Sequence, residues 1–278
     1  MSVDANKWNW GSLTQRERDT AYNNTEAVPD SGALIEERNL ASAPFRAANA
    51  GHLDLAYGAS QREQWDLYPG SNPMAPTLVF VHGGYWQRNR REDFACLAEG
   101  ALAMGWNVAM CGYSLCPEVT MTRLAYQIHE ALGWLSTHGP EHGLAGPIVL
   151  TGWSAGGHLT ALGAEHPAVT AAIAISGIFE LGPIRDTYLN AALKLTDEEI
   201  IELSPMRRPV VQKPMAIVYG AAELPELCRQ SRDFHALRAA AQAPGPLLPI
   251  PGADHFRVIE ALRQPDGVML RLAAELLR

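Results

Sequence analysis

One serine of this chain stands in a sequence context that suits a nucleophile. Residues 152–156 read Gly-Trp-Ser-Ala-Gly, an apolar run precedes them at 148–150, and a small-residue helix pattern follows. This spacing is typical of a tight strand-to-helix turn that exposes the hydroxyl of the central serine, here Ser154. The two flanking glycines are needed because a Cβ at those positions would collide with neighbouring elements. The first N–H groups of the helix would then face the negative charge that develops during acyl transfer.

A second glycine-containing segment could stabilise that charge. An apolar run at 77–81 leads directly into His-Gly-Gly-Tyr-Trp at 82–86. Glycines let the backbone approach a reacting carbonyl closely, so the N–H groups of Gly83 and Gly84, with that of Ala155, are the predicted oxyanion-hole donors. An ordinary glycine turn at a strand end is the alternative for this segment alone. This segment lies one crossover and one strand before the serine turn, and that position favours the functional interpretation.

The general base should be a histidine that follows the serine in the chain. His255 lies on a loop between the short apolar run 247–250 and a helix pattern. His235 falls inside an amphipathic helix pattern and is more simply a residue of the helix face. His255 is therefore the predicted base, with its Nε2 directed at the serine hydroxyl.

The acid that orients this histidine should follow the apolar run 215–219. Glu223 stands three residues beyond Gly220 and is the first choice, and Glu226 is the alternative. The carboxylate would accept the other imidazole proton and stabilise the imidazolium. A solvated loop carboxylate is the ordinary alternative for Glu223.

The elements that must position these residues form an alternating pattern. Two half-polar runs at 53–57 and 64–68 predict an antiparallel hairpin at a sheet edge. Buried strands are expected over 77–81, 106–110, 148–150, 169–175, 215–219 and 247–250. Helices are expected over 94–104, 121–136, 228–241, 257–262 and 268–277. Alternating strands and helices imply a mostly parallel sheet covered on both faces, which places the chain in the α/β class.

The N-terminal part of the chain has a different pattern. Residues 1–50 are polar and turn-rich, with short helical stretches at 13–22 and 31–40. We interpret them as an arm or cap on a single α/β catalytic domain that comprises residues 51–278. Whether this arm acts as a lid stays open at this point.

Composition and charge exclude several function classes. The 278 residues carry a formal net charge of −8, and the longest basic cluster is the short run 88–91. This balance argues against nucleic acid and anionic membranes as partners. We find no apolar run of membrane-spanning length and no signal-peptide pattern, so a cytoplasmic protein is predicted. Cys96, Cys111, Cys116 and Cys228 have no regular spacing and are expected to be reduced thiols, although Cys111 and Cys116 are close enough in sequence to pair.

No cofactor or metal is expected. The sequence contains no nucleotide-binding glycine motif. His138 and His142 have a metal-like spacing, but Gly139 and Pro140 interrupt any helix between them. His158, on the helix after the serine, is interpreted as a structural residue.

Five segments of the chain carry a resemblance to known proteins: His-Gly-Gly-Tyr-Trp (82–86), Gly-Tyr-Ser-Leu-Cys-Pro-Glu (112–118), Gly-Trp-Ser-Ala-Gly-Gly-His (152–158), Ser-Gly-Ile-Phe-Glu-Leu (176–181) and Asp-His-Phe (254–256). Together they resemble the hormone-sensitive-lipase-type branch of the α/β hydrolases, and within it most of all the kynurenine formamidases (arylformamidases) and their bacterial relatives. The resemblance covers about residues 50–265 and implies the α/β-hydrolase fold. One departure is Glu223, where that family usually has aspartate.

The resemblance implies a serine hydrolase with a Ser-Glu-His triad that cleaves an N-formyl aryl amide to formate and an aryl amine, as in tryptophan breakdown. Four aromatic residues would then be expected near the substrate, although core packing also accounts for such side chains; they are Tyr85, Trp86, Trp153 and Phe179. The alternatives are a carboxylesterase, lactonase or xenobiotic aryl amidase with the same triad, and a binding protein of this fold without chemistry. The expected partner is a small aromatic amide or ester, and a homodimer is compatible with the resemblance.

Overall fold

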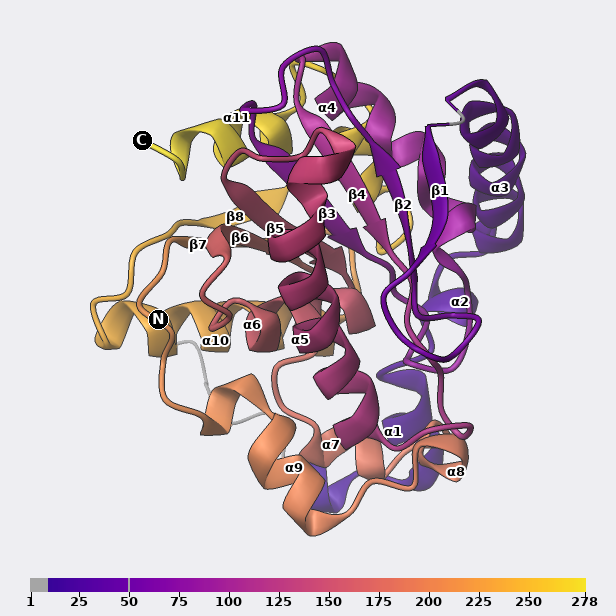
Figure 1. The fold of residues 1–278 in the computed structure, drawn as a ribbon. Helices are drawn as coiled ribbons and strands as arrows, with labels where there is room; N and C mark the ends of the chain where they lie inside the picture. The colour runs from indigo at the N-terminus through magenta and orange to yellow at the C-terminus, as the bar shows by residue number, and fades with distance from the viewer. Residues whose placement is uncertain (1–9, 50) are drawn as a thin grey trace.

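The computed structural model describes residues 10–49 and 51–278, and its centre is one mixed β-sheet of eight strands (Figure 1). The strand order is β1-β2-β4-β3-β5-β6-β7-β8. β1 and β2 pair antiparallel, as do β2 and β4, and all other neighbours are parallel. The strands are β1 (His52–Ala56), β2 (Gln64–Tyr68), β3 (Thr77–Val81), β4 (Asn107–Cys111), β5 (Ile148–Trp153), β6 (Val169–Ile175), β7 (Met215–Gly220) and β8 (Leu247–Ile250).

Helices cover both faces of this sheet. The longer ones are α3 (Ser31–Ala48), α5 (Met121–His138), α6 (Ala155–Gly163), α10 (Pro225–Ala240) and α11 (Val268–Glu275). The shorter α-helices are α1 (Gln15–Thr20), α2 (Asn24–Ala27), α4 (Glu99–Ala103), α7 (Gly182–Arg185), α8 (Asn190–Leu193) and α9 (Asp197–Leu203). The 3₁₀ helices are η1 (Trp10–Ser12), η2 (Arg91–Ala98), η3 (Gly139–His142), η4 (Pro205–Arg207) and η5 (Val258–Leu262).

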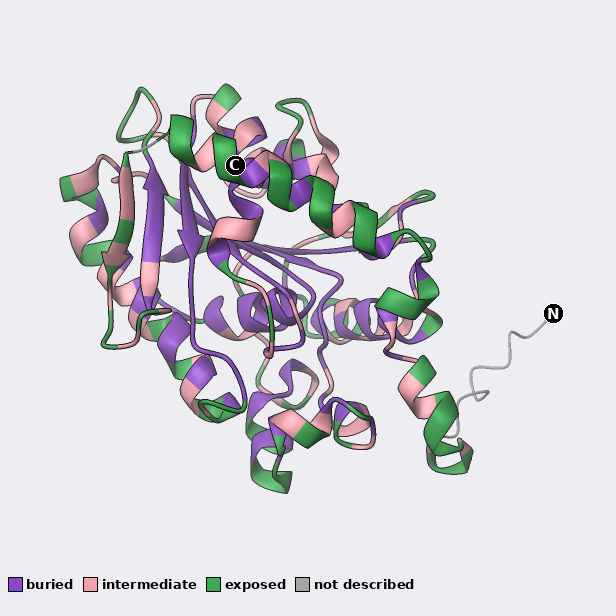
Figure 2. Cartoon of the chain, turned by 90° about the vertical axis from the view of Figure 1, so that its right-hand side faces the viewer, coloured by how far each residue is buried: buried purple, intermediate pink, exposed green. Residues whose placement is uncertain are grey.

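The alternation of side chains along each strand divides the core into two layers. Val79 and Val81 of β3 pack with residues of α5 and α6 on one face. Leu78 and Phe80 of the same strand pack with residues of η2, η5 and α11 on the other face. Every residue of β3, β4, β5 and β7 is buried, as Figure 2 shows for the central strands. A strand buried on both faces has no polar side to present, which explains the continuous apolar runs in the sequence.

The predicted α/β class and mostly parallel sheet are confirmed. The strands predicted at 77–81, 169–175 and 247–250 have the same bounds in the structure, and the hairpin of β1 and β2 lies at the sheet edge. The helix predicted over 94–104 differs, because its first part is the 3₁₀ helix η2 and only residues 99–103 are α-helical. The Asp93 carbonyl oxygen of η2 accepts bonds from the side chains of Arg38 and Ser42.

Residues 10–49 lie against the domain at two places. α3 packs along η2, which gives the contacts of Arg38 and Ser42 described above. At the other end, α1 lies beside α7 and α8 in Figure 1, and the indole N–H of Trp10 donates to Asp186. Residues 1–9 and Ala50, which belong to the predicted arm, lie outside the described residues.

Two further expectations can be compared with the described residues. The four cysteines are buried and free, so Cys111 and Cys116 do not pair. Within the described part of the chain, no helix is both long enough and apolar enough to cross a bilayer.

The crossing of α6 over β3 generates a stability prediction. A Cβ on Gly156 would lie 2.0 Å from the Val81 carbonyl oxygen, and a backbone atom cannot move aside as a flexible side chain can. Gly156→Ala is expected to lower the free energy of unfolding by about 3 kcal/mol or more, measured by urea denaturation. The control is Gly32→Ala in α3, where nothing lies within 4 Å of the added atom. The Gly32→Ala change should be neutral or stabilise the protein by up to about 1 kcal/mol. Equal losses of stability in both variants would contradict the close packing of Gly156 against β3.

Candidate active site

Ser154 occupies a strained turn between β5 and α6. Its backbone has φ 59° and ψ −120°, a left-handed conformation that non-glycine residues rarely adopt. The Ser154 N–H donates to the Ile175 carbonyl at 2.8 Å, which ties the turn to the end of β6. A Cβ on Gly152 would lie 2.3 Å from the Gly156 carbonyl oxygen, so the two glycines make the close strand-to-helix approach feasible. Strain of this kind persists only where the surrounding structure enforces it.

His255 and Glu223 meet beside this turn. The Nδ1 atom of His255 lies 2.8 Å from Oε2 of Glu223. The other carboxylate oxygen, Oε1, accepts bonds from the Ser176 hydroxyl at 2.5 Å and from the Gly220 N–H at 2.6 Å. The indole N–H of Trp153 donates to the His255 carbonyl at 2.8 Å. The carboxylate is thus held by three donors, and His255 is held through both its imidazole and its backbone carbonyl.

Glu226 has different partners. Its Oε1 accepts a bond from the Tyr22 hydroxyl at 3.0 Å, and the side chain forms an ion pair with Arg229. These contacts attach the N-terminal residues to α10. Of the two carboxylates considered in the loop after β7, the structure brings only Glu223 to His255.

The glycines of residues 82–86 lie against the serine turn. A Cβ on Gly83 would be 2.9 Å from the Ser154 Cβ and 2.7 Å from the Trp153 carbonyl oxygen. Gly84 has a φ of +118°. Among the hydrogen bonds of residues 10–49 and 51–278, none is donated by the backbone N–H of Gly83, Gly84 or Ala155. Three free donors therefore lie on the two segments that meet at Ser154.

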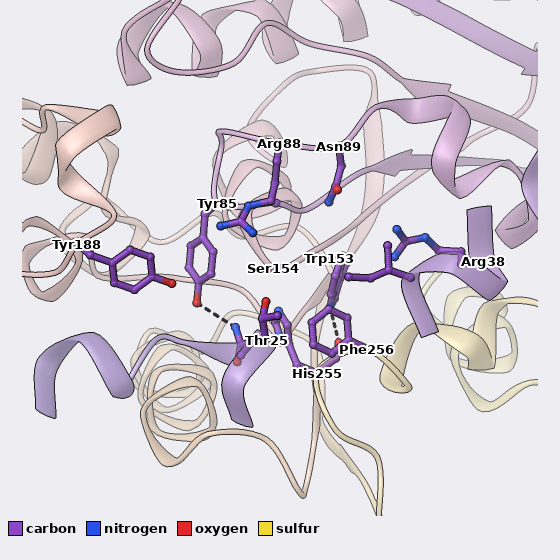
Figure 3. A pocket seen from close by; sticks show the side chains of 13 residues that line it. Thr25, Arg38, Tyr85, Arg88, Asn89, Trp153, Ser154, Tyr188, His255 and Phe256 are labelled. Carbon is purple, nitrogen blue, oxygen red and sulfur yellow. Dashed lines mark hydrogen bonds between the residues drawn. The ribbon is translucent and has the colours of Figure 1, made fainter. Parts of the chain in front are cut away.

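Ser154 and His255 line one cavity, whose empty space is about 490 Å³ when the part open to solvent is included (Figure 3). The complete lining is Asn24, Thr25, Ile35, Arg38, Gly84, Tyr85, Arg88, Asn89, Trp153, Ser154, Tyr188, His255 and Phe256. The segments after β3, β5 and β8 all contribute, as is usual for ligand sites at the carboxyl ends of parallel strands.

The four aromatic residues predicted near a substrate separate into two pairs. Tyr85 and Trp153 line the cavity. Trp86 does not, because it is fully buried and its indole N–H donates to Nδ1 of His158 at 3.2 Å. Phe179 also lies elsewhere, stacked on Phe234 of α10 with 4.3 Å between ring centroids. These two rings pack in the core, as aromatic side chains most often do.

Several lining residues were not predicted from the sequence. Asn24 and Thr25 of α2, with Ile35 and Arg38 of α3, come from the N-terminal segment. That segment carries no motif, and only its tertiary packing brings it to the cavity. Asn24 is held there because its amide donates to the Tyr85 hydroxyl at 2.9 Å, and this hydroxyl donates to the Tyr22 carbonyl at 2.6 Å. Burial raises the pKa of Tyr85 well above its ordinary value, so the hydroxyl stays neutral in this network.

Comparisons with known proteins show what the chain is similar to. Residues 66–199 match the family model BD-FAE. Kynurenine formamidase of Danio rerio is 26% identical over 290 residues, which are 96% of this chain and 98% of that enzyme. Esterase LipQ of Mycobacterium tuberculosis strain H37Rv is 34% identical over 131 residues, 44% of this chain and 30% of that one. The crystal structure of a candidate thioesterase from Silicibacter sp. TM1040 superposes with a TM-score of 0.84 at 30% identity, over 93% of this chain and 99% of that chain.

The chain belongs to the kynurenine formamidase-like α/β hydrolases. The predicted α/β-hydrolase fold is confirmed, and the family is one of hydrolases that includes esterases and formamidases. The similarity in sequence and the similarity in fold therefore each cover most of the chain.

The buried His158 generates a prediction on stability at acid pH. Its Nδ1 accepts the Trp86 N–H and its Nε2 donates to the Leu203 carbonyl at 2.7 Å, so the ring is neutral. Burial lowers the pKa of His158 from 6.5 to about 4. The unfolded chain therefore binds a proton that the folded chain does not, and stability should fall as the pH decreases from 6.5 to 4.

Urea unfolding of the wild type and of His158→Gln at pH 7, 5.5 and 4.5 measures this contribution. The variant should be less stable at pH 7, because a buried hydrogen bond is lost, and its stability should depend less steeply on pH. Identical slopes for the two proteins would show that His158 does not titrate as described.

The two glutamates of the loop after β7 generate a prediction on activity. Glu223→Gln is expected to lower kcat by roughly 10³- to 10⁴-fold, as loss of the orienting carboxylate does in other hydrolases with such a triad. Glu226→Gln is the matched control, because its side chain contacts Tyr22 and Arg229 rather than His255. Its kcat should stay near the wild-type value. A greater loss in the Glu226 variant would assign the acid to that residue.

Proposed function

We propose that this α/β hydrolase is a serine hydrolase that removes the formyl group from N-formyl aryl amides, with Ser154, His255 and Glu223 as its triad. The observation that carries the proposal is the 2.8 Å contact of His255 with Glu223, next to a serine on a strained turn in the same cavity. A nucleophile, a base and an orienting acid in this order along the chain suit acyl transfer.

In the proposed reaction, Nε2 of His255 takes the hydroxyl proton of Ser154 while the serine oxygen attacks the formyl carbon. The carbonyl oxygen becomes an oxyanion that the N–H groups of Gly83, Gly84 and Ala155 stabilise. Glu223 stabilises the imidazolium that forms. His255 then gives its proton to the departing aryl amine, and the C–N bond breaks. Water, deprotonated by His255, hydrolyses the formyl ester to formate and free serine.

Three observations support this assignment for this chain. The hydrogen bonds from Ser176 and Gly220 hold the Glu223 carboxylate, so the longer side chain can replace the aspartate usual in the family. Aromatic rings of Tyr85, Trp153 and Phe256 line the cavity, which suits a flat leaving group. The similarity to the kynurenine formamidase of Danio rerio over nearly the whole of both chains supports the formamide as substrate.

A carboxylesterase, lactonase or xenobiotic aryl amidase with the same triad is the second candidate. The 34% identity with esterase LipQ over 131 residues supports this second candidate. The substrate differs between these candidates while the proposed triad does not, because function within a fold is set by the residues around the substrate.

The deciding experiment measures kcat/KM for N-formyl-L-kynurenine and for p-nitrophenyl acetate. A formamide value of about 10⁴ M⁻¹s⁻¹ or more, typical of natural substrates, is expected. Ser154→Ala should abolish both activities, because the nucleophile is removed, while circular dichroism remains that of the wild type. Turnover of the ester with little formamide cleavage would favour the second candidate. Unchanged activity of the alanine variant would overturn the triad.

A further inference from the structure

The cavity at Ser154 has a charge opposite to that of the whole chain. The protein carries a formal net charge of −8. The residues that line the cavity include two arginines, Arg38 and Arg88, and no aspartate or glutamate among the described residues. Two cations without a carboxylate at a cavity wall favour an anionic ligand over a neutral one.

Arg38 contributes charge, but two of its donors are already in use. Its Nε donates to the Asp93 carbonyl at 3.0 Å, and its Nη2 donates to Asn39 at 3.3 Å. The guanidinium carbon lies 4.0 Å from the centre of the Phe94 ring. The residue is 4% exposed, and these contacts join α3 to η2. Arg38 is therefore mainly a structural residue.

Arg88 differs from Arg38 in that its guanidinium has no partner among the described residues. Among residues 10–49 and 51–278, no acceptor forms a hydrogen bond or an ion pair with its guanidinium. The two other arginines of the same basic run have carboxylate partners: Arg90 pairs with Asp93, and Arg91 pairs with Asp54 and Asp66. Of the basic residues at 88–91, only the one that lines the cavity lacks a carboxylate within the described part of the chain.

The backbone directs Arg88 to the reaction centre. Its N–H donates to the Gly84 carbonyl at 3.1 Å, and a Cβ on Gly84 would lie 2.9 Å from the Arg88 Cγ. The stem thus packs on a glycine that we assign to the oxyanion hole. Figure 3 shows the guanidinium turned towards Tyr85. The pKa values of Tyr85 and Tyr188 are raised mainly by burial, and the Arg88 cation opposes both rises, which places its charge near both hydroxyls.

We propose that Arg88 is a specificity-determining residue that binds a carboxylate on the leaving group of the substrate. The proposal rests on the hydrolase function proposed above and adds to it that aryl amides whose amine part carries a carboxylate are preferred to those without one. A guanidinium suits this role because its planar donors pair with both oxygens of a carboxylate. The formyl group is too small to carry the charge, so the anion belongs to the amine part of the substrate.

The test compares two substrates that share the α-ammonium group and differ in the carboxylate, the zwitterion N-formyl-L-kynurenine and its carboxamide, with wild type, Arg88→Gln and Arg88→Lys. Arg88→Gln is expected to raise KM for the acid about tenfold, the effect of losing one charge-assisted hydrogen bond, with kcat nearly unchanged. KM for the carboxamide should change by less than about twofold, and Arg88→Lys should be intermediate. The matched control is Arg232→Gln on α10, an exposed arginine that does not line the cavity.

A second readout separates this proposal from the proposed function. N-formyl-L-kynurenine and its carboxamide are tested as competitive inhibitors of p-nitrophenyl acetate hydrolysis, which needs no formamide cleavage. If the formamide is not cleaved but the acid inhibits more strongly than the carboxamide, and Arg88→Gln removes this difference, the substrate assignment fails and the role of Arg88 stands. Equal effects of Arg88→Gln on acid and carboxamide, in turnover or in inhibition, would overturn the inference.

Discussion

The close approach of three backbone segments at Ser154 is the constraint on which the rest of the structure depends. β3 ends in the glycines of residues 83–84, β5 ends in the serine turn, and α6 begins directly after it. Carbonyl oxygens occupy the positions that a Cβ on Gly152 or Gly156 would take. Because no side chain fits between these segments, the backbone N–H groups of the two turns can face the same point. The positive φ of Ser154 is the local cost of this arrangement, and the packing of β3, β5 and β6 around it offsets that cost.

A polar network joins this centre to the N-terminal residues. Tyr22 is fully buried, and its hydroxyl contacts both Glu226 and Gln230 of α10. Its carbonyl accepts the Tyr85 hydroxyl, which in turn accepts the amide of Asn24. α2 is only four residues long and could not be stable alone. These bonds to the domain hold it at the cavity wall, so a segment without any catalytic motif forms part of the site.

The charges around the site have separate roles. The carboxylate of Glu223 lies behind the imidazole of His255, where two further donors hold it. Arg88 lines the cavity and is exposed to solvent, so a ligand can reach its cation. In a protein of net negative charge, such a local cation concentrates anionic ligands at the cavity and leaves neutral ones unaffected. The residues proposed to react and the residue proposed to select the substrate are therefore separate side chains.

The sequence by itself determined the class of the fold and the turns that carry the reacting groups. Strands buried on both faces leave continuous apolar runs, and glycines at fixed spacing around a serine reflect a local steric requirement, so both are visible without a structure. Only the tertiary structure shows that Glu223 rather than Glu226 contacts His255, because both follow β7 and only their distant partners, His255 and Tyr22, distinguish them. The positions of Trp86 and Phe179 in the core, and of α2 and Arg38 at the cavity, also depend on contacts between residues far apart in the chain. Such contacts leave no periodic pattern in the sequence, because they form between distant segments that only folding brings together.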